Sequence, residues 1–380
     1  MSKCTLFFSR CACAILLVLL SSIFAQASEL DSVRTLNLDP NLVWDKISPS
    51  DYELSEDSLT LVRWTNESTR NLNMEQDSRL SKVQFIGDGA FSSDAYALET
   101  VVLASSVKRI GSHAFFRCSN LKKMLIPTSV TSIGNSAFAM CSSLSRLDIP
   151  NSVSYIGEGA FFTCGLKSIV MPSSLKKIED DTFSYCMSLT SVTIPASVTS
   201  IGNGAFSKNY ELEEVIMPSS VTHIGDYAFD DCHKLAKLAI PKSVTSIGKQ
   251  AFANCFELSG IELPPSLTRI EEGTFFSCNK LKNIVIPPSV VTIRDRAFSD
   301  CQILESVIIP SSVTSIGKDA FSSSFSDVLL NLRFESPKPP YVDDFIASEY
   351  SKIRIIVPKG AREAYIKANL VANAECIVEE

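Results

Sequence analysis

The most regular feature of the chain is a pattern of apolar positions that returns every 22 to 24 residues. An Ile lies five residues before a Phe in each unit, and a Val or Leu lies eight residues before it. A fixed period this short indicates stacked supersecondary units, each too small to fold alone. Eleven phenylalanines mark the units: Phe91, Phe115, Phe138, Phe161, Phe183, Phe206, Phe229, Phe252, Phe275, Phe298 and Phe321.

Two segments of each unit alternate apolar and polar residues at period two, which predicts two short strands. One is Leu-x-x-apolar-x-apolar-Pro, as in residues 121–127, where the Pro ends the strand because it has no amide to donate. The other is the Ser-Val-Thr-Ser-Ile type of segment that precedes the Phe. The residues around the Phe are predicted to form a brief helical or 3₁₀ turn, with the ring filling the space between the strands.

Two positions of the unit vary in an informative way. A Gly follows the Ile in most units, which suggests a turn with positive φ. Glu179, Glu271 and Arg294 stand at that position instead, so positive φ is favoured there without being compulsory. An Ala precedes the Phe except at Thr182 and Thr274.

The assembled unit resembles the BspA-like leucine-rich-repeat surface proteins. Residues 126–138, Ile-Pro-Thr-Ser-Val-Thr-Ser-Ile-Gly-Asn-Ser-Ala-Phe, carry the resemblance nearly in full. It spans residues 81–334, and residues 335–380 resemble the terminal unit of that family. The resemblance implies a mostly β, α/β-type solenoid: a right-handed leucine-rich-repeat superhelix of about eleven coils with parallel strands, capped at both ends. It also implies a role in adhesion to host proteins or to other cells.

The first 27 residues are predicted to be a secretory signal peptide. Lys3 and Arg10 supply positive charge, an apolar stretch covers residues 11–24, and Ala25-Gln26-Ala27 offers a cleavage site. An uncleaved anchor is the alternative, although the stretch is shorter than a spanning helix needs. No later segment is predicted to cross a membrane, so the protein is expected to be secreted or at the cell surface. Residues 28–80 lack the repeat and are predicted to form a cap or a separate small domain.

Eight of the 12 cysteines lie three residues after the Phe of a unit. Asn209, Ser324 and Asp94 take the same position in other units. Because Cys, Asn and Ser are small and can bond to backbone, the pattern predicts an inward ladder of free side chains. Disulfides between coils are the alternative, since coil spacing lies near the required Cα separation. The eight are Cys118, Cys141, Cys164, Cys186, Cys232, Cys255, Cys278 and Cys301.

Candidate chemistry is sparse. The chain has three histidines, His113, His223 and His233, each interpreted as a surface residue. Metal sites need clustered Cys and His, whereas these cysteines are spread at the repeat period. A net charge of −7 argues against a nucleic-acid partner, which would require a basic surface. We therefore expect a non-enzymatic protein without a cofactor.

The candidate binding surface is the outer side of the Leu-x-x-apolar-x-apolar strands. The residue between the last two apolar positions should point outward. Solenoids bind through such faces, and exposed apolar residues often mark a contact, although β-branched residues also simply favour strands. The predicted row is Val102, Leu125, Val170, Ile216, Val285 and Ile308, flanked by Lys123, Arg146 and Lys237.

This surface predicts an exported binding or adhesion protein. Its ligand would be a protein or a glycan, with host matrix or another cell as candidate sources. A structural or self-assembling cell-surface component is the alternative, in which the apolar row packs against another copy of the chain.

Overall fold

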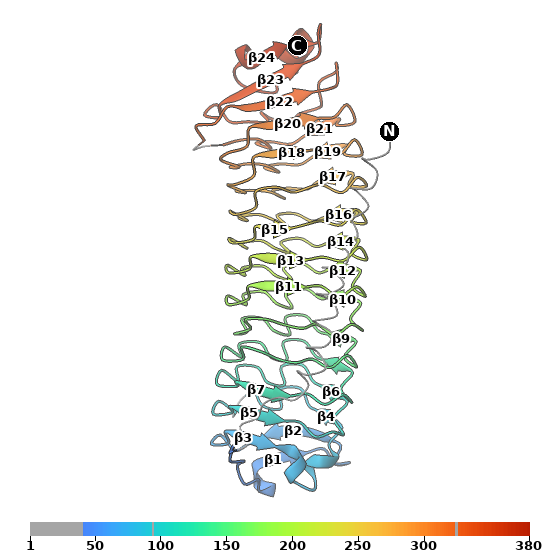
Figure 1. Cartoon of the computed structure of the whole chain (residues 1–380), viewed down its shortest axis with the longest axis vertical. Coiled ribbons are helices and arrows are strands. Elements are labelled where there is room, and N and C mark those ends of the chain that lie inside the picture. The colour runs from blue at the N-terminus through green and yellow to red at the C-terminus, as the bar shows by residue number, and fades with distance from the viewer. Residues whose placement is uncertain (1–40, 93–94, 324–325) are drawn as a thin grey trace, which may run out of the picture. The chain divides into compact units, whose positions relative to one another are not determined.

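The structure, a computed structural model, describes residues 41–92, 95–323 and 326–380. The predicted signal peptide, residues 28–40, Asp94 and Ser324 lie outside the described residues. Residues 45–380 form one unit, a parallel β-solenoid of about 14 turns with little helix (Figure 1). The predicted fold class is confirmed. The number of coils is higher than the predicted eleven because chain segments at both ends continue the strand columns without the sequence motif.

The Ser-Val-Thr-Ser-Ile segments form the first strand column. Neighbouring strands are parallel and in register, so Ile201 pairs with Ile224 and the row of Ile side chains lies in the core. The column begins with an antiparallel pair, β1 and β2. Its strands are β1 (Tyr52–Leu54), β2 (Thr60–Trp64), β4 (Phe85–Ile86), β6 (Arg109–Ile110), β8 (Ser132–Ile133), β9 (Tyr155–Ile156), β10 (Lys177–Ile178), β12 (Ser200–Ile201), β14 (His223–Ile224), β16 (Ser246–Ile247), β17 (Arg269–Ile270), β19 (Thr292–Ile293) and β21 (Ser315–Ile316).

The Leu-x-x-apolar-x-apolar segments form the second strand column. Leu and the following apolar residues point inward, and the Pro ends the strand. The strands are β3 (Asn71–Asn73), β5 (Thr100–Val102), β7 (Lys123–Leu125), β11 (Ser191–Thr193), β13 (Glu214–Ile216), β15 (Lys237–Leu238), β18 (Asn283–Val285), β20 (Ser306–Ile309), β22 (Leu330–Phe334), β23 (Ile353–Val357) and β24 (Ile377–Glu379).

The third side of each coil carries the Phe and is called the turn side. The predicted helical or 3₁₀ turn around the Phe is wrong. No helix forms there among the described residues. The chain instead makes successive β-turns, with left-handed residues two positions before and two after the Phe, such as His113 (φ 56°) and Arg117 (φ 63°). These residues interrupt any helical run. The amide of each Phe donates to the coil above, meaning the next coil toward the C-terminus, as from Phe115 to the carbonyl of Ala137 at 2.8 Å.

The eleven Phe rings stack along the core. Ring centroids of neighbouring coils lie between 4.6 and 5.7 Å apart, and the rings are buried. At this spacing each ring from Phe115 to Phe298 lies against a Phe ring on both sides. The core is therefore continuous from coil to coil.

The Gly that follows the Ile in most units is favoured by the limited space between coils and not by positive φ, contrary to the prediction. A Cβ added to Gly225 would lie 2.6 Å from the carbonyl carbon of Gly202 and 2.7 Å from the amide of Asn203. The left-handed conformation falls two residues later, at Tyr227 (φ 58°). Gly is therefore favoured because a Cβ at this position would come too close to the backbone of the neighbouring coil.

Each end of the array is closed by residues outside the motif. Trp64 takes the place of a Phe: its amide donates to Ala90 at 2.8 Å and its ring lies 5.8 Å from that of Phe91. At the other end Tyr365 is buried and its hydroxyl donates to the Ser336 carbonyl at 2.8 Å. Within residues 41–92, 95–323 and 326–380, the helical elements lie toward these ends: η1 (Pro49–Asp51), η2 (Met74–Gln76), η3 (Leu80–Lys82), α2 (Arg362–Lys367) and η4 (Ala374–Cys376).

Candidate functional site

Most of the predicted apolar row lies on the surface. On the outer face of the second strand column, Val170 is 48% exposed, Ile216 54%, Val285 69% and Ile308 41%. Leu125, further toward the N-terminal end, is half-buried. We call the four exposed residues the exposed apolar row. Large aliphatic side chains this exposed contribute little to the core, so they are available for contact with another molecule.

Val102 was predicted in this row but is buried, with only 7% of its surface exposed. The reason lies in the first coils, where η2 packs beside β5. The Glu75 carboxylate of η2 accepts a hydrogen bond from the Ser105 amide at 2.6 Å. Residues that lack the repeat motif therefore cover this end of the face.

The exposed apolar row has a rim of mixed charge. Lys123, Arg146 and Lys237 are exposed, as predicted from their position in the strands. Arg146 pairs with Asp148 at 3.3 Å, and Lys237 lies 3.9 Å from Glu214. Exposed pairs of this kind contribute little to stability. Their effect is to frame the apolar side chains with groups of both signs, as in the polar rim of a protein interface.

A second surface feature escaped the sequence interpretation. Tyr210, His233 and Phe256 stand four residues after the Phe in consecutive coils and stack, with centroids 4.8 and 4.5 Å apart. The His233 Nε2 lies 3.5 Å from a carboxylate oxygen of Asp231. The shared position in three consecutive units was the available signal. The His233 ring lies between the other two, tilted by 30° to Tyr210 and stacked on Phe256.

The predicted thiol ladder is confirmed. All eight repeat cysteines are buried and free. Most thiols donate to the Phe carbonyl one coil below, as from Cys232 to Phe206 at 3.2 Å. Asn209, which replaces Cys in one coil, makes the same bond to Phe183 at 2.9 Å and another to Phe206 at 2.8 Å. Burial raises the pKa of the Cys186 thiol to about 12, which makes it unreactive at neutral pH.

The Asp230 carboxylate, in the same part of the chain, is partly buried where its charged form is disfavoured. One oxygen of Asp230 is buried without a hydrogen-bond partner among the described residues. Burial, with the charge of Asp231 adding to it, raises the pKa of Asp230 to about 6, while Lys208 opposes the shift. The folded protein therefore holds a proton on Asp230 at pH values where the unfolded chain, with a pKa near 3.9, has lost it.

Asp230→Asn should therefore stabilise the protein at neutral pH. A raised carboxyl pKa means that stability falls as pH rises from about 4 to about 6, and that the full cost is present above pH 6. We expect the variant to gain about 1–2 kcal/mol at pH 7.5, after allowance for partial exposure, and no gain at pH 4. Urea unfolding of both proteins at several pH values measures this difference. An equal difference at all pH values would contradict the assignment.

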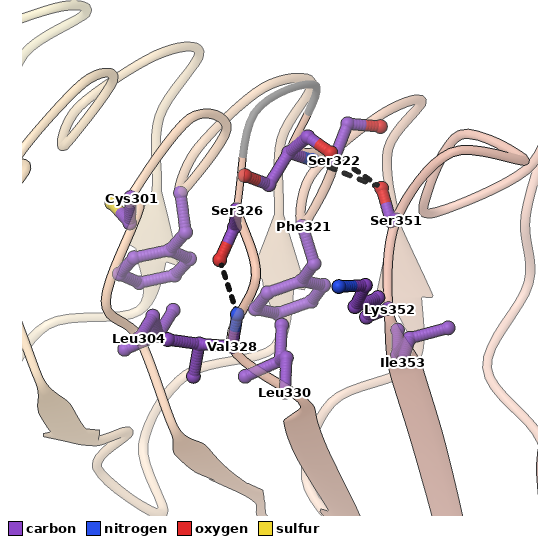
Figure 2. A pocket seen from close by; sticks show the side chains of 12 residues that line it. Cys301, Leu304, Phe321, Ser322, Ser326, Val328, Leu330, Ser351, Lys352 and Ile353 are labelled. Atoms are coloured by element: carbon purple, nitrogen blue, oxygen red, sulfur yellow. Dashed lines mark hydrogen bonds between the residues drawn. The ribbon is translucent and has the colours of Figure 1, made fainter.

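A small pocket lies between the last repeat coils and the C-terminal coils (Figure 2). Core residues such as Phe298, Cys301 and Phe321 line it together with several serines. Its charged residue, Lys352, pairs with Asp327 at 2.6 Å. The described residues that line the pocket include no His, Asp or Glu, and they offer packing and hydroxyl contacts.

The described residues contain no group of three or more His, Cys, Asp or Glu side chains placed to hold a metal ion. Within the same residues, no helix has both the length and the apolar character of a membrane span.

Comparison with known proteins identifies the repeat. A family model described as a BspA type leucine rich repeat region, in six copies, matches residues 84–213 and 199–327. A leucine-rich repeat protein from Bacteroides ovatus is 22% identical, with a TM-score of 0.63 and coverage of 91% of this chain and 100% of that one. The pneumococcal vaccine antigen PcpA is 20% identical, with a TM-score of 0.51 and coverage of 79% and 83%. These two similarities concern the fold.

A leucine rich cell surface protein from Faecalibacterium prausnitzii is 29% identical over 77% of this chain and 96% of that one, with a TM-score of 0.46. A comparison with proteins of curated function found no match.

Proposed function

Since the chain belongs to the BspA-type leucine-rich-repeat family, whose members are cell-surface proteins with generally binding or adhesive roles, we propose that it is an exported, non-enzymatic binding protein. Its ligand is a protein, held on the outer face of the second strand column. Leucine-rich-repeat proteins bind proteins as a class, and the predicted leader in residues 1–27 supports export.

The observation that carries the proposal is the exposed apolar row. Val170, Ile216, Val285 and Ile308 occupy the same outward position in their coils and remain exposed, although the fold buries the inward residues beside them almost completely. Interfaces of soluble proteins combine a desolvated apolar centre with a polar rim, and the pairs around Arg146 and Lys237 supply such a rim.

The proposal predicts that charges in this row abolish ligand binding without unfolding the protein. We would test residues 28–380 against matrix proteins, whole cells and glycans, beside the triple variant Val170→Lys, Ile216→Lys and Val285→Lys. Because a few central residues dominate most interfaces, the variant should bind its protein ligand at least about 100-fold more weakly. Circular dichroism establishes that the variant is folded.

A matched control places lysines at exposed positions of the first strand column, by Tyr155→Lys and His223→Lys, and directly before its strand β19, by Val291→Lys. This control should bind like the unmodified protein. Loss of binding in the control alone would move the site to the first strand column. A glycan as the ligand would contradict the protein partner, and a concentration-dependent oligomer that the row variant disrupts would indicate self-assembly.

A further inference from the structure

Both strand columns are interrupted between the same two pairs of neighbouring coils (Figure 1). The first column divides between β9 and β10 and between β16 and β17. The second divides between the bridge at Val170 and β11. It divides again between β15 and β18, a gap that also takes in the Phe252 coil, because residues 260–263 form no strand. We call these places the first junction, between the Phe161 and Phe183 coils, and the second junction, between the Phe252 and Phe275 coils. Two further gaps in the second column, between β7 and Asp148 and between β15 and the Phe252 coil, have no counterpart in the first.

One backbone hydrogen bond distinguishes the junctions from all other neighbouring coils in the repeat array. Elsewhere the residue after the Ile donates its amide to the Ile carbonyl one coil below, at 2.8 to 2.9 Å, as from Gly225 to Ile201. Among the described residues this bond is missing between Glu179 and Ile156 and between Glu271 and Ile247. The two missing bonds coincide with the two interruptions.

The cause lies in the residues that replace Gly. A Cβ at the neighbouring glycines would come within 2.4 to 2.8 Å of backbone atoms of the coil below, as Gly248 shows against the Asp226 amide. Glu179 and Glu271 carry a Cβ at this position, so their backbone must lie further from the coil below. Arg294 also replaces Gly but keeps its bond to Ile270 at 2.8 Å. A Cβ alone is therefore not sufficient to open a junction.

A second substitution accompanies Glu at both junctions and is absent at Arg294. Thr182 and Thr274 stand where other units have Ala, and both are buried. Their hydroxyls donate to the carbonyls of Glu179 and Glu271, at 2.8 and 2.9 Å. Thr adds atoms between closely packed coils and satisfies a carbonyl beside the interrupted ladder. The combination Glu-x-x-Thr-Phe is therefore the sequence signature of a junction.

The turn side remains closed at both junctions. At the first, the Phe161 amide donates to Thr182 at 2.9 Å. At the second, the Phe252 amide donates to Thr274 at 3.0 Å. The Phe rings remain stacked across the junctions, at 5.4 and 5.7 Å. The strand ladders are thus interrupted at each junction, while the Phe turns remain bonded. Single hydrogen bonds still cross elsewhere: the Thr190 amide donates to Lys167 at 3.4 Å at the first junction. At the second, the Lys280 amide donates to Phe256 at 3.1 Å and the Thr274 hydroxyl to Gly248 at 3.4 Å.

We infer that the two junctions are hinges, at which three rigid segments of the solenoid change their mutual angle while the turn side stays closed. Val170 lies in the first segment, Ile216 in the second, and Val285 in the third. Opening a hinge would therefore change the curvature of the face that bears the exposed apolar row. The inference rests on the backbone and stands whether or not that face binds a ligand.

Hydrogen exchange of the full chain, read by mass spectrometry, tests the hinges directly. Amides are protected according to the free energy of local opening. We expect residues 176–179 and 268–271 to exchange at least about tenfold faster than the equivalent residues 199–202 and 222–225. Equal exchange at junctions and at other coils would overturn the inference.

Reciprocal variants separate a hinge from general weakness of these coils. Glu179→Gly with Thr182→Ala restores the common motif and should slow exchange at 176–179 to the level of 199–202. Gly225→Glu with Ala228→Thr should create a third junction and speed exchange at 222–225 about tenfold. Arg294→Gly is the control and should leave exchange at 291–294 unchanged.

The first of these variants decides the matter even if the second fails to fold, because it removes a steric conflict and adds none. Unchanged exchange at 176–179 in that variant would mean that the Glu-x-x-Thr pair does not cause the interruption, and the inference would be wrong.

Discussion

Phe206→Ala should lower the free energy of unfolding by about 3–5 kcal/mol, because removal of a buried ring leaves a cavity that the surroundings fill only in part. The ring is fully buried and lies 5.4 Å from that of Phe183 and 5.3 Å from that of Phe229. In a repeat array each coil is stabilised mainly by its neighbours, so one substitution weakens two interfaces. Urea unfolding followed by circular dichroism measures the loss.

Phe206→Leu serves as the control for this prediction. Leu keeps much of the ring's volume in the same apolar setting, so the loss should be clearly smaller than that of Ala. If the Ala variant lost less than about 1 kcal/mol, the Phe stack would not be the principal core of these coils.

Trp64→Ala should have a comparably large effect, about 3–5 kcal/mol, but confined to the N-terminal coils. The indole is buried between the rings of Phe91 and Tyr52, at 5.8 and 6.2 Å, and ends the Phe stack. Without it the first ring of the stack would face solvent, and terminal coils of a solenoid unfold separately when their cover is lost. Limited proteolysis should then cut the chain between residues 50 and 110 first.

Val62→Ala is the matched control, since Val62 lies on the same strand with its side chain exposed. It should leave the proteolysis pattern unchanged. Uniform cleavage along the whole array in the Trp64 variant would show that this end does not act as a cap.

The core of this protein could be predicted from the sequence because every coil repeats the same environment. Ile, Phe and Cys recur at fixed positions, and a side chain that is inward in one coil is inward in the next. The replacement of Cys by Asn209 in one coil was especially informative, since both side chains can donate to the Phe carbonyl. The inward ladder was predicted from this exchange together with Ser324 at the same position in another unit.

The conformations of individual residues could not be predicted in the same way. The Gly after Ile has two physical explanations, positive φ or close approach, and the choice depends on the coil below, which the sequence of one unit does not contain. The left-handed positions are occupied by residues as different as His113, Tyr227 and Arg296. No compositional signal therefore marked the turn side as non-helical.

The burial of Val102 and the additional N-terminal coil could not be predicted either, because both depend on residues outside the repeat motif. Val102 matches the outward position of the motif, but η2, which lacks the motif, lies beside it. Trp64 follows the inward Leu61 by three residues, whereas each Phe follows its Ile by five, so the additional coil at this end was not visible in the period. Sequence periodicity describes contacts between similar coils and not those made by irregular ends.

The thiol ladder also provides a way to measure the opening of individual coils. Eight coils each carry one Cys, buried and with its pKa raised by burial, as for Cys118 and Cys301. Such a thiol becomes accessible to an alkylating reagent, and ionises to the reactive thiolate, only when its coil opens. The rate at which each cysteine is modified therefore records the opening of one coil, at intervals of about one repeat along the array. Between Cys118 and Cys301, the coil with Asn209 carries no repeat cysteine, so its opening is not recorded.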